Sequence, residues 1–362
     1  MDQNDFVDAA TSVALEAVVQ VLSRDELCLV IGFFAGVQAA RNLTAASQLH
    51  NECMGTRVLQ TLAAQLHQDV FVFGGRPPQH EFFEPRVEVW EPLPAMRAIR
   101  SNGTGAALAG KIYVVGGWAD GGQITTEDEV FDLTTLQWEP MPPMPTRRVL
   151  AAASAAFGKL FVVGGLAGDG LHLAVVEVFD PSGNGWQQIS SLSCRRCSAA
   201  VAPISTIDDG SGGAIYAIGG LSASGRHLSS VERLRVGIDN ESSEWSWESA
   251  ASLPSAFVSG AAVTRRGKVY VVGGWGRAHP SANAFRLDPA LNRWEPLPPM
   301  PTPRAVCAAA AAANCIYVVG GRSAGAQATA IVECFDIDTG EWSTSVPMSV
   351  GRTGCVAVAA WR

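Results

Sequence analysis

The sequence predicts an all-β propeller of six sheets, preceded by a short α-helical segment. Three observations predict this fold: a glycine pair that recurs six times, an apolar run before each pair, and a tryptophan after each pair that lies at a nearly constant distance from the next pair. Internal repeats of this length indicate an architecture in which each repeat forms one structural unit. We therefore expect residues 1–66 to form the helical segment and residues 67–362 to form the propeller.

The glycine pairs end short runs that are rich in β-branched and aromatic residues, such as Ile112–Val115 and Val269–Val272. Runs of this kind are typical of strands that are buried on both faces. The pairs are Gly74-Gly75, Gly116-Gly117, Gly164-Gly165, Gly219-Gly220, Gly273-Gly274 and Gly320-Gly321. Because the backbone must turn sharply after each strand, we expect these glycines to have positive φ.

A tryptophan follows each glycine pair, and in four of five intervals the next pair begins 26 residues later (138 to 164, for example). The exception, 33 residues, contains an insertion rich in Asp and Gly around residues 207–213. The tryptophans are Trp90, Trp138, Trp186, Trp247, Trp294 and Trp342. A large apolar side chain suits the gap between neighbouring sheets, so we expect these residues to be structural.

Each repeat divides into four strands, A to D. Strand A is small and alanine-rich (150–156 and 306–312), strand B is the apolar run, strand C ends in an aromatic residue and an acid (Val176–Asp180), and strand D carries the tryptophan. The segment Gly354–Ala360 has the composition of strand A, and the first repeat lacks its own strand A. We therefore expect this segment to complete the first sheet and to close a ring of six blades.

Two repeats carry a recognisable consensus. The residues Ile112-Tyr113-Val114-Val115-Gly116-Gly117, Val130-Phe131-Asp132 and Trp138-Glu139-Pro140-Met141-Pro142 resemble a kelch repeat, and so does the unit from Val269 to Pro298. The resemblance covers roughly residues 68–362. It implies a kelch-type β-propeller with one four-stranded blade per repeat. In kelch substrate adaptors, the resemblance further implies, the B–C and D–A loops hold the bound peptide.

Residues 6–66 lack the alternation of strands and are expected to be helical. Ser23-Arg24-Asp25-Glu26 fits a capping box at the start of a helix. The segment 22–47 resembles a degenerate F-box, the helical motif that docks receptors onto cullin–RING ubiquitin ligases. Ser23 stands in place of the usual proline, and His50 stands near the place of the usual tryptophan. Two interpretations stay open: an F-box, or a helical cap that packs on the propeller.

Candidate partner-binding residues lie in the loop between strand D and the next strand A. Ten residues after each tryptophan, five of six positions hold arginine, although the net charge of the protein is −8. They are Arg100, Arg148, Arg196, Arg304 and Arg352, and Phe257 holds the remaining position. We expect their guanidinium groups to form a ring around the mouth of the channel that suits carboxylates or a phosphate on a peptide. Alternatively, they tie loops to carbonyls of neighbouring blades.

The residue after each glycine pair belongs to the same face as this loop. Trp118 and Trp275 are candidate anchors for a partner, and Arg322 is a candidate cation. The other residues at this position are Arg76, Leu166 and Leu221. The glutamates of strand C are expected to be partners between blades or within hairpins. They are Glu177, Glu232 and Glu333.

Composition argues against several classes of protein. The negative net charge does not suit a nucleic-acid interface, which needs a basic face. The longest apolar run, Leu27–Val37, is shorter than the roughly 20 residues that span a bilayer, and the first residues lack a basic signal-peptide region. We expect the eight cysteines to be reduced thiols in the cytoplasm or nucleus. Cys194 and Cys197 form a lone CxxC without the second ligand pair that zinc requires.

No set of residues indicates catalysis, a cofactor or a metal. All four tyrosines occupy one repeat position, and the six histidines fall in different units without ligand spacing. The sequence therefore favours a module that binds a protein or peptide partner, with an acidic segment as one candidate. A role as the substrate receptor of a cullin–RING ubiquitin ligase is the sharper hypothesis. The alternatives are a kelch scaffold without a link to ubiquitin and a small-sugar-modifying propeller enzyme similar to sialate epimerases.

Overall fold

The computed structural model describes residues 68–76, 81–84, 89–183, 185–204, 213–236, 245–276, 278–325 and 327–361. The expected helical segment, residues 1–66, lies outside the described residues. Within them, all regular secondary structure is β-strand. The prediction of an all-β propeller is therefore confirmed for the described part of the chain.

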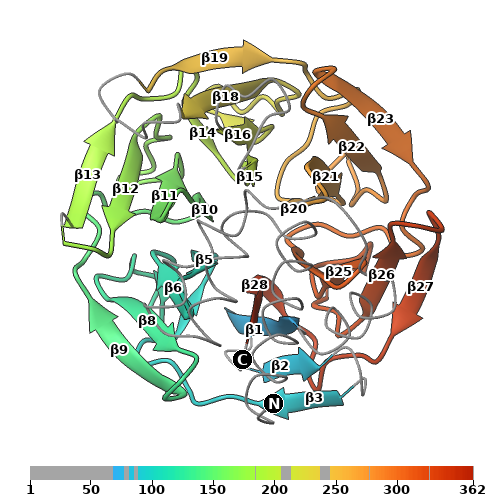
Figure 1. Cartoon of the computed structure of the whole chain (residues 1–362). Coiled ribbons are helices and arrows are strands. Elements are labelled where there is room, and N and C mark those ends of the chain that lie inside the picture. Colours follow the sequence, from blue (N-terminus) through green and yellow to red (C-terminus); the bar gives the residue numbers. More distant parts are fainter. Residues whose placement is uncertain are drawn as a thin grey trace, which may run out of the picture. The chain divides into compact units, whose positions relative to one another are not determined.

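The described strands form six four-stranded sheets, which stand around a central axis as blades (Figure 1). From the axis outward, blade 1 contains β28 (Thr353–Trp361), β1 (Gln68–Arg76), β2 (Glu81–Glu84) and β3 (Val89–Pro92). Blade 2 contains β5 (Thr104–Leu108), β6 (Lys111–Val115), β8 (Asp128–Asp132) and β9 (Gln137–Met141). Blade 3 contains β10 (Ala152–Ala156), β11 (Lys159–Val163), β12 (Val176–Asp180) and β13 (Gly185–Ile189).

The other three blades follow in chain order. Blade 4 contains β15 (Ala200–Ile204), β16 (Gly213–Ile218), β18 (Val231–Val236) and β19 (Trp247–Ala250). Blade 5 contains β20 (Ala261–Arg265), β21 (Lys268–Val272), β22 (Ala284–Asp288) and β23 (Arg293–Leu297). Blade 6 contains β24 (Ala308–Ala312), β25 (Cys315–Val319), β26 (Val332–Asp336) and β27 (Trp342–Ser345). The positions in each blade, from the axis outward, are strands A, B, C and D.

Strand B is the most deeply buried element of each blade. The side chains of β11 from Leu160 to Val163 are at most 1% exposed, as expected for an apolar run covered on both faces. The glycine pair that follows has positive φ in every blade, for example 61° at Gly164 and 107° at Gly165, which confirms that expectation. A Cβ atom on Gly165 would lie 2.9 Å from the carbonyl oxygen of Val149, so the pair is also needed for close packing.

Each tryptophan of strand D joins its blade to the preceding one. The indole N–H of Trp138 donates a hydrogen bond of 2.9 Å to Pro94 O, and that of Trp90 donates one of 2.9 Å to Val346 O, between the last and first blades. The remaining donors and acceptors are Trp186 and Pro142 O, Trp247 and Ser190 O, Trp294 and Ala251 O, and Trp342 and Pro298 O. The predicted structural role of these tryptophans is confirmed.

Candidate functional site

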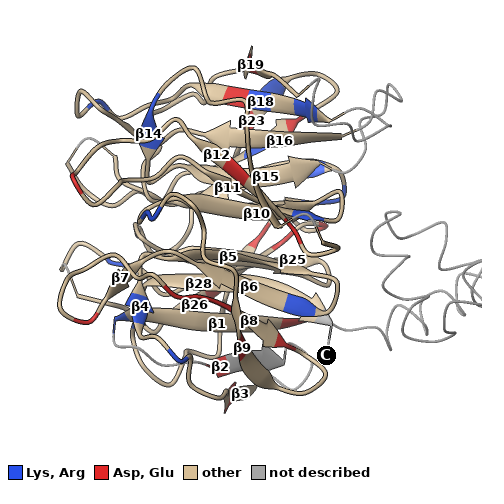
Figure 2. Cartoon of the chain, turned by 90° about the vertical axis from the view of Figure 1, so that its left-hand side faces the viewer, with Lys and Arg blue, Asp and Glu red and all other residues tan. Residues whose placement is uncertain are grey.

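The B–C and D–A loops share one face of the propeller, which we call the loop face. Two short sheets connect these loops: β4 (Arg100–Ser101) with β7 (Trp118–Ala119), and β14 (Arg196–Cys197) with β17 (Leu221–Ser222). In Figure 2, β4, β7 and β14 all lie on the same side of the blades. Isolated bridges make the equivalent contact elsewhere, for example between Val149 and Leu166. The two sets of loops are therefore held together by backbone pairing.

The five arginines of the D–A loops are buried, with at most 2% of each residue exposed. Each forms an ion pair with a buried glutamate of strand C. The pairs, with their N–O distances, are Arg100–Glu129 (2.6 Å), Arg148–Glu177 (2.5 Å), Arg196–Glu232 (2.6 Å), Arg304–Glu333 (2.5 Å) and Arg352–Glu81 (2.6 Å). The structure thereby brings together the repeated arginines and the strand C glutamates that the sequence indicated separately.

Arg148 shows how such a residue connects two blades. Its guanidinium group donates hydrogen bonds to Gly164 O at 3.0 Å, to Val175 O at 2.9 Å and to Thr146 O at 3.0 Å, which fixes it to blade 3 and its entry loop. Its own carbonyl oxygen accepts the N–H of Gly117 in blade 2 at 3.1 Å. The carbonyl oxygens of Arg196, Arg304 and Arg352 accept the equivalent N–H from the preceding blade at 2.9 Å each. We call all five residues, with Arg100, the staple arginines.

The expected ring of exposed guanidinium groups is therefore corrected. The charges of Arg100, Arg148, Arg196, Arg304 and Arg352 are turned into the fold and neutralised there, so these groups do not reach a partner on the surface. Burial lowers the pKa of Arg148, and the adjacent Glu177 opposes this shift. The structure supports the alternative in which the arginines tie loops to neighbouring carbonyls. A buried ion pair needs such additional hydrogen bonds to offset its desolvation.

The junction between blades 4 and 5 uses two phenylalanines instead of an ion pair. Phe257 holds the staple position, and Phe285 holds the strand C position, where it pairs with Val271 and Pro296. Both rings belong to one hydrophobic cluster. Arginine and glutamate are thus exchanged together for an apolar pair at a single junction.

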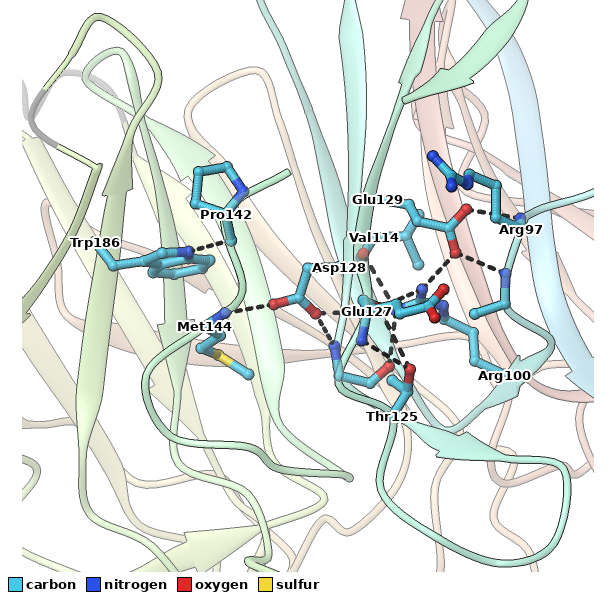
Figure 3. A network of polar contacts seen from close by, with 12 residues as sticks. Arg97, Arg100, Val114, Thr125, Glu127, Asp128, Glu129, Pro142, Met144 and Trp186 are labelled. Carbon is cyan, nitrogen blue, oxygen red and sulfur yellow. Dashed lines mark hydrogen bonds and ion pairs between the residues drawn. The ribbon is translucent and has the colours of Figure 1, made fainter. Parts of the chain in front are cut away.

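Blade 2 contains an additional buried carboxylate beside its staple (Figure 3). Asp128 accepts the N–H groups of Gly116 at 2.9 Å and Met144 at 2.6 Å, and burial raises its pKa. In blade 3, the corresponding acceptors are the backbone carbonyls of Val175 and Ala174. The Asp128 carboxylate thus replaces two carbonyl groups, which explains its burial without a catalytic role.

A closed cycle of backbone hydrogen bonds surrounds the axis on the loop face. Two residues after each staple position, the backbone has positive φ, between 52° and 65°. These residues, which we call the collar, are Asn102, Leu150, Ser198, Ser259, Val306 and Gly354. Each collar N–H donates to the collar carbonyl of the preceding blade: 150 to 102 (3.1 Å), 198 to 150 (2.7 Å), 259 to 198 (2.8 Å), 306 to 259 (2.6 Å), 354 to 306 (3.2 Å) and 102 to 354 (2.9 Å).

The collar also explains a shift in strand A. Strand A begins at Ala152 and Ala308, two residues later than the sequence suggested, because Leu150 and Val306 leave the strand conformation. A positive φ costs energy for a β-branched residue such as Val306, so the surrounding hydrogen bonds must hold it in place. The collar is a closed ring of backbone hydrogen bonds at the centre of the loop face.

The residues after the glycine pairs stand around the collar, and we call this set the rim. Trp118 and Trp275 are half-buried, whereas Arg322 is exposed. The N–H of Trp275 donates to Val258 O at 2.7 Å, and that of Arg322 donates to Ala305 O at 2.7 Å, so backbone contacts fix both. The other rim residues are Arg76, which is exposed, and Leu166 and Leu221, which are half-buried. The structure places the candidate residues Trp118, Trp275 and Arg322 on one face.

A second set of exposed residues was not anticipated from the sequence. They are the residues directly before each staple position, which we call the shoulder. Arg147 and Arg195 are exposed, and Ile99 is 43% exposed. The remaining shoulder residues are Ala256, Pro303 and Gly351. The signal in the sequence was the doublets Arg147-Arg148 and Arg195-Arg196, in which only the second arginine is a staple.

The described residues hold no group of three or more His, Cys, Asp or Glu side chains that could bind a metal ion. They also hold no helix of the length and apolar character that crossing a membrane requires. Burial raises the pKa of Cys307 to about 11 and that of Cys355 to about 12, so both remain protonated thiols at neutral pH.

Comparisons with known proteins agree with this architecture. A family model described as the Attractin/LZTR1 beta-propeller matches residues 112–360. Kelch-like protein 26 of Danio rerio is 33% identical over 154 residues, which cover 40% of this chain and 24% of that protein. Beta-scruin of Limulus polyphemus is 31% identical over 116 residues, which cover 30% of this chain and 12% of that protein. The chain thus matches less than a quarter of the length of these curated relatives.

A solved structure entitled "Structure of YjhT" is similar in fold, with a TM-score of 0.65 and 16% sequence identity. The superposition covers 77% of this chain and 94% of that chain. At this identity the likeness shows the fold alone. Together with the kelch-like relatives, these matches confirm the resemblance to kelch-repeat propellers.

Proposed function

The chain belongs to the Attractin/LZTR1 beta-propeller family, and we propose that it is a protein-interaction module whose loop face binds a protein or peptide partner. The observation that carries this proposal is the rim, where Trp118, Trp275 and Arg322 stand around the hydrogen-bonded collar. Tryptophan and arginine are the residues that most often dominate the energy of protein interfaces.

The loop face also suits a partner with acidic groups. Arg76, Arg322, Arg147 and Arg195 are exposed there, in a protein whose net charge is −8. Arginine forms two parallel hydrogen bonds with a carboxylate, which gives both affinity and orientation. We therefore assign contact with the partner's acidic groups to the exposed rim and shoulder arginines instead of the buried staple arginines.

The module is tested by comparing the partners of the full chain with those of a Trp118→Ala/Trp275→Ala variant, using proximity labelling in cells. The variant should lose one or more specific partners and keep a cooperative unfolding transition. Leu291→Ala is the matched control, because Leu291 is 65% exposed in the turn between β22 and β23, away from the loop face. An unchanged partner list in the tryptophan variant would contradict the proposal.

We further propose that the chain delivers its partner to a cullin–RING ubiquitin ligase. The support for this step is the F-box-like order of residues in the segment 22–47, which lies outside the described residues. The full chain should retain a cullin-complex adaptor in a pull-down, and Leu27→Ala/Val30→Ala should release it while the propeller keeps its own partner. Failure of the unaltered chain to retain any adaptor would leave the protein as a kelch scaffold without a link to ubiquitin.

A further inference from the structure

The exposed arginines of the rim and shoulder form two pairs on opposite sides of the axis. Arg76 and Arg322 belong to the rim of blades 1 and 6, which are neighbours. Arg147 and Arg195 belong to the shoulders that lead into blades 3 and 4, which are also neighbours. In the ring of blades seen in Figure 1, the junction of blades 6 and 1 lies across the axis from the junction of blades 3 and 4.

The two tryptophans occupy the sectors between these arginine pairs. Trp118 belongs to blade 2 and Trp275 to blade 5, and these blades face each other across the axis (Figure 1). Their shoulder residues, Ile99 and Ala256, are uncharged. Going around the rim and shoulder, arginine pairs therefore alternate with aromatic and apolar sectors. The collar lies at the centre of this arrangement.

Three lysines of the opposite face form ion pairs with aspartates of strand C. Lys111, Lys159 and Lys268 begin strand B in three blades, at the end remote from the loop face. Their ion-pair partners are Asp132, Asp180 and Asp288, respectively. On the loop face, the exposed carboxylates Asp120, Glu127 and Asp169 stand later in the B–C loops, outside the rim and shoulder positions. Outside the rim and shoulder, the loop face also carries the exposed arginines Arg97 and Arg226.

We propose that the partner segment crosses the loop face from one arginine pair to the other, with an acidic group at each end and an apolar side chain between the tryptophans. A segment with two acidic groups binds more tightly than one with a single group, because the second contact forms within an existing complex. The flanking indoles exclude water from an apolar residue that passes between them. This inference rests on the proposed function and specifies the chemistry and direction of the partner.

The test uses fluorescein-labelled peptides with a leucine at the centre of a Gly-Ser spacer of graded length. In one series each end of the peptide carries two glutamates, and in a second series only one end carries them. Binding to the full chain is measured by fluorescence anisotropy at low salt, because exposed charges are screened by ions. The variants are Arg76→Ala/Arg322→Ala and Arg147→Ala/Arg195→Ala, and Arg293→Ala in β23 is the control.

The two-ended peptide of the best spacer length should bind at least about tenfold more tightly than its one-ended counterpart. Either double variant should remove this advantage, and Arg293→Ala should keep it. Equal affinity of the two series, sensitivity to one arginine pair only, or no binding of any peptide would overturn the two-ended geometry. The proposed function fails separately, if the tryptophan variant loses no partner in cells.

Discussion

Replacing one staple by the apolar pair that the protein itself uses elsewhere gives the sharpest test of how the blades are joined. Arg148→Ala removes the ion pair with Glu177 and three hydrogen bonds to carbonyl groups, and it leaves a buried carboxylate behind. Breaking a buried pair from one side costs about 3–5 kcal/mol. For a domain of this size we expect Tm to fall by roughly 10 °C.

The double variant Arg148→Phe/Glu177→Phe places two phenylalanines at the junction of blades 2 and 3. It thereby copies the pair Phe257 and Phe285, which joins blades 4 and 5. Since well-packed apolar residues often replace a buried ion pair without loss, we expect this variant to recover most of the stability, to within about 1–2 kcal/mol of the natural protein. Arg147→Ala is the control, because a change at an exposed position usually shifts stability by about 0.5 kcal/mol or less.

Urea unfolding followed by tryptophan fluorescence measures these differences, with the slope of the transition compared between variants. Either of two results would contradict the structural role of the staple. One is an Arg148→Ala variant as stable as the Arg147→Ala control. The other is a double phenylalanine variant no more stable than Arg148→Ala, since the junction would then require the charges themselves.

Three further expectations concern the opposite face, the blade junctions and the collar. The Lys111 ammonium holds the pKa of Asp132 at about 2, so this pair should stabilise the fold fully above pH 4 and progressively less as the pH falls toward 2. Lys111→Met should therefore cost roughly 0.5 kcal/mol at pH 7 and less near pH 3 in urea titrations, whereas a pH-independent difference would contradict this. Trp186→Phe removes the hydrogen bond to Pro142 O and should lower stability by about 1 kcal/mol in the same assay, and an unchanged midpoint would contradict this. Val306→Asn should raise the free energy of unfolding by about 1 kcal/mol, because asparagine tolerates positive φ better than a β-branched residue, and a lower free energy of unfolding would show that packing of the valine outweighs its strain.

The repeating unit could be predicted from the sequence because its markers are imposed by geometry. A glycine pair is needed where strand B turns beneath the next loop, and a Cβ atom on Gly165 would nearly touch Val149 O. The tryptophans recur because one side chain both fills the gap between blades and donates to the preceding loop, as Trp138 does to Pro94 O. Residues with such roles permit few substitutions, so their spacing survives in every repeat.

The role of the repeated arginines could not be predicted from their positions alone. An arginine at the mouth of a channel can face solvent or turn inward, and the difference depends on a partner that is distant in sequence. The partner was nevertheless visible, since Arg148 precedes Glu177 by 29 residues and Arg304 precedes Glu333 by the same interval. Phe285 replaces the glutamate at the junction where Phe257 replaces the arginine. This joint exchange indicates contact between the two positions.

The collar left almost no trace in the sequence, because it consists of backbone groups. Asn102, Leu150 and Val306 share neither size nor polarity, and only Asn102 and Gly354 are of residue types that positive φ favours. Nor could the sequence distinguish exposed Arg147 from buried Arg148, its neighbour. Which of the two side chains is buried depends on the contacts that the staple makes with the neighbouring blade, and these exist only in the folded propeller.

The double phenylalanine variant also separates the two roles that a repeated arginine can have. If the staple arginines act only by holding the loops in place, Arg148→Phe/Glu177→Phe keeps the rim and collar where they are, and the partner should bind with unchanged affinity. If the guanidinium group of Arg148 touched the partner, the same variant would fold normally and lose affinity. The burial of this group, with 0% exposure, predicts the first result. A loop face held rigid in this way loses little conformational entropy when it binds, so its affinity depends on the exposed rim and shoulder residues.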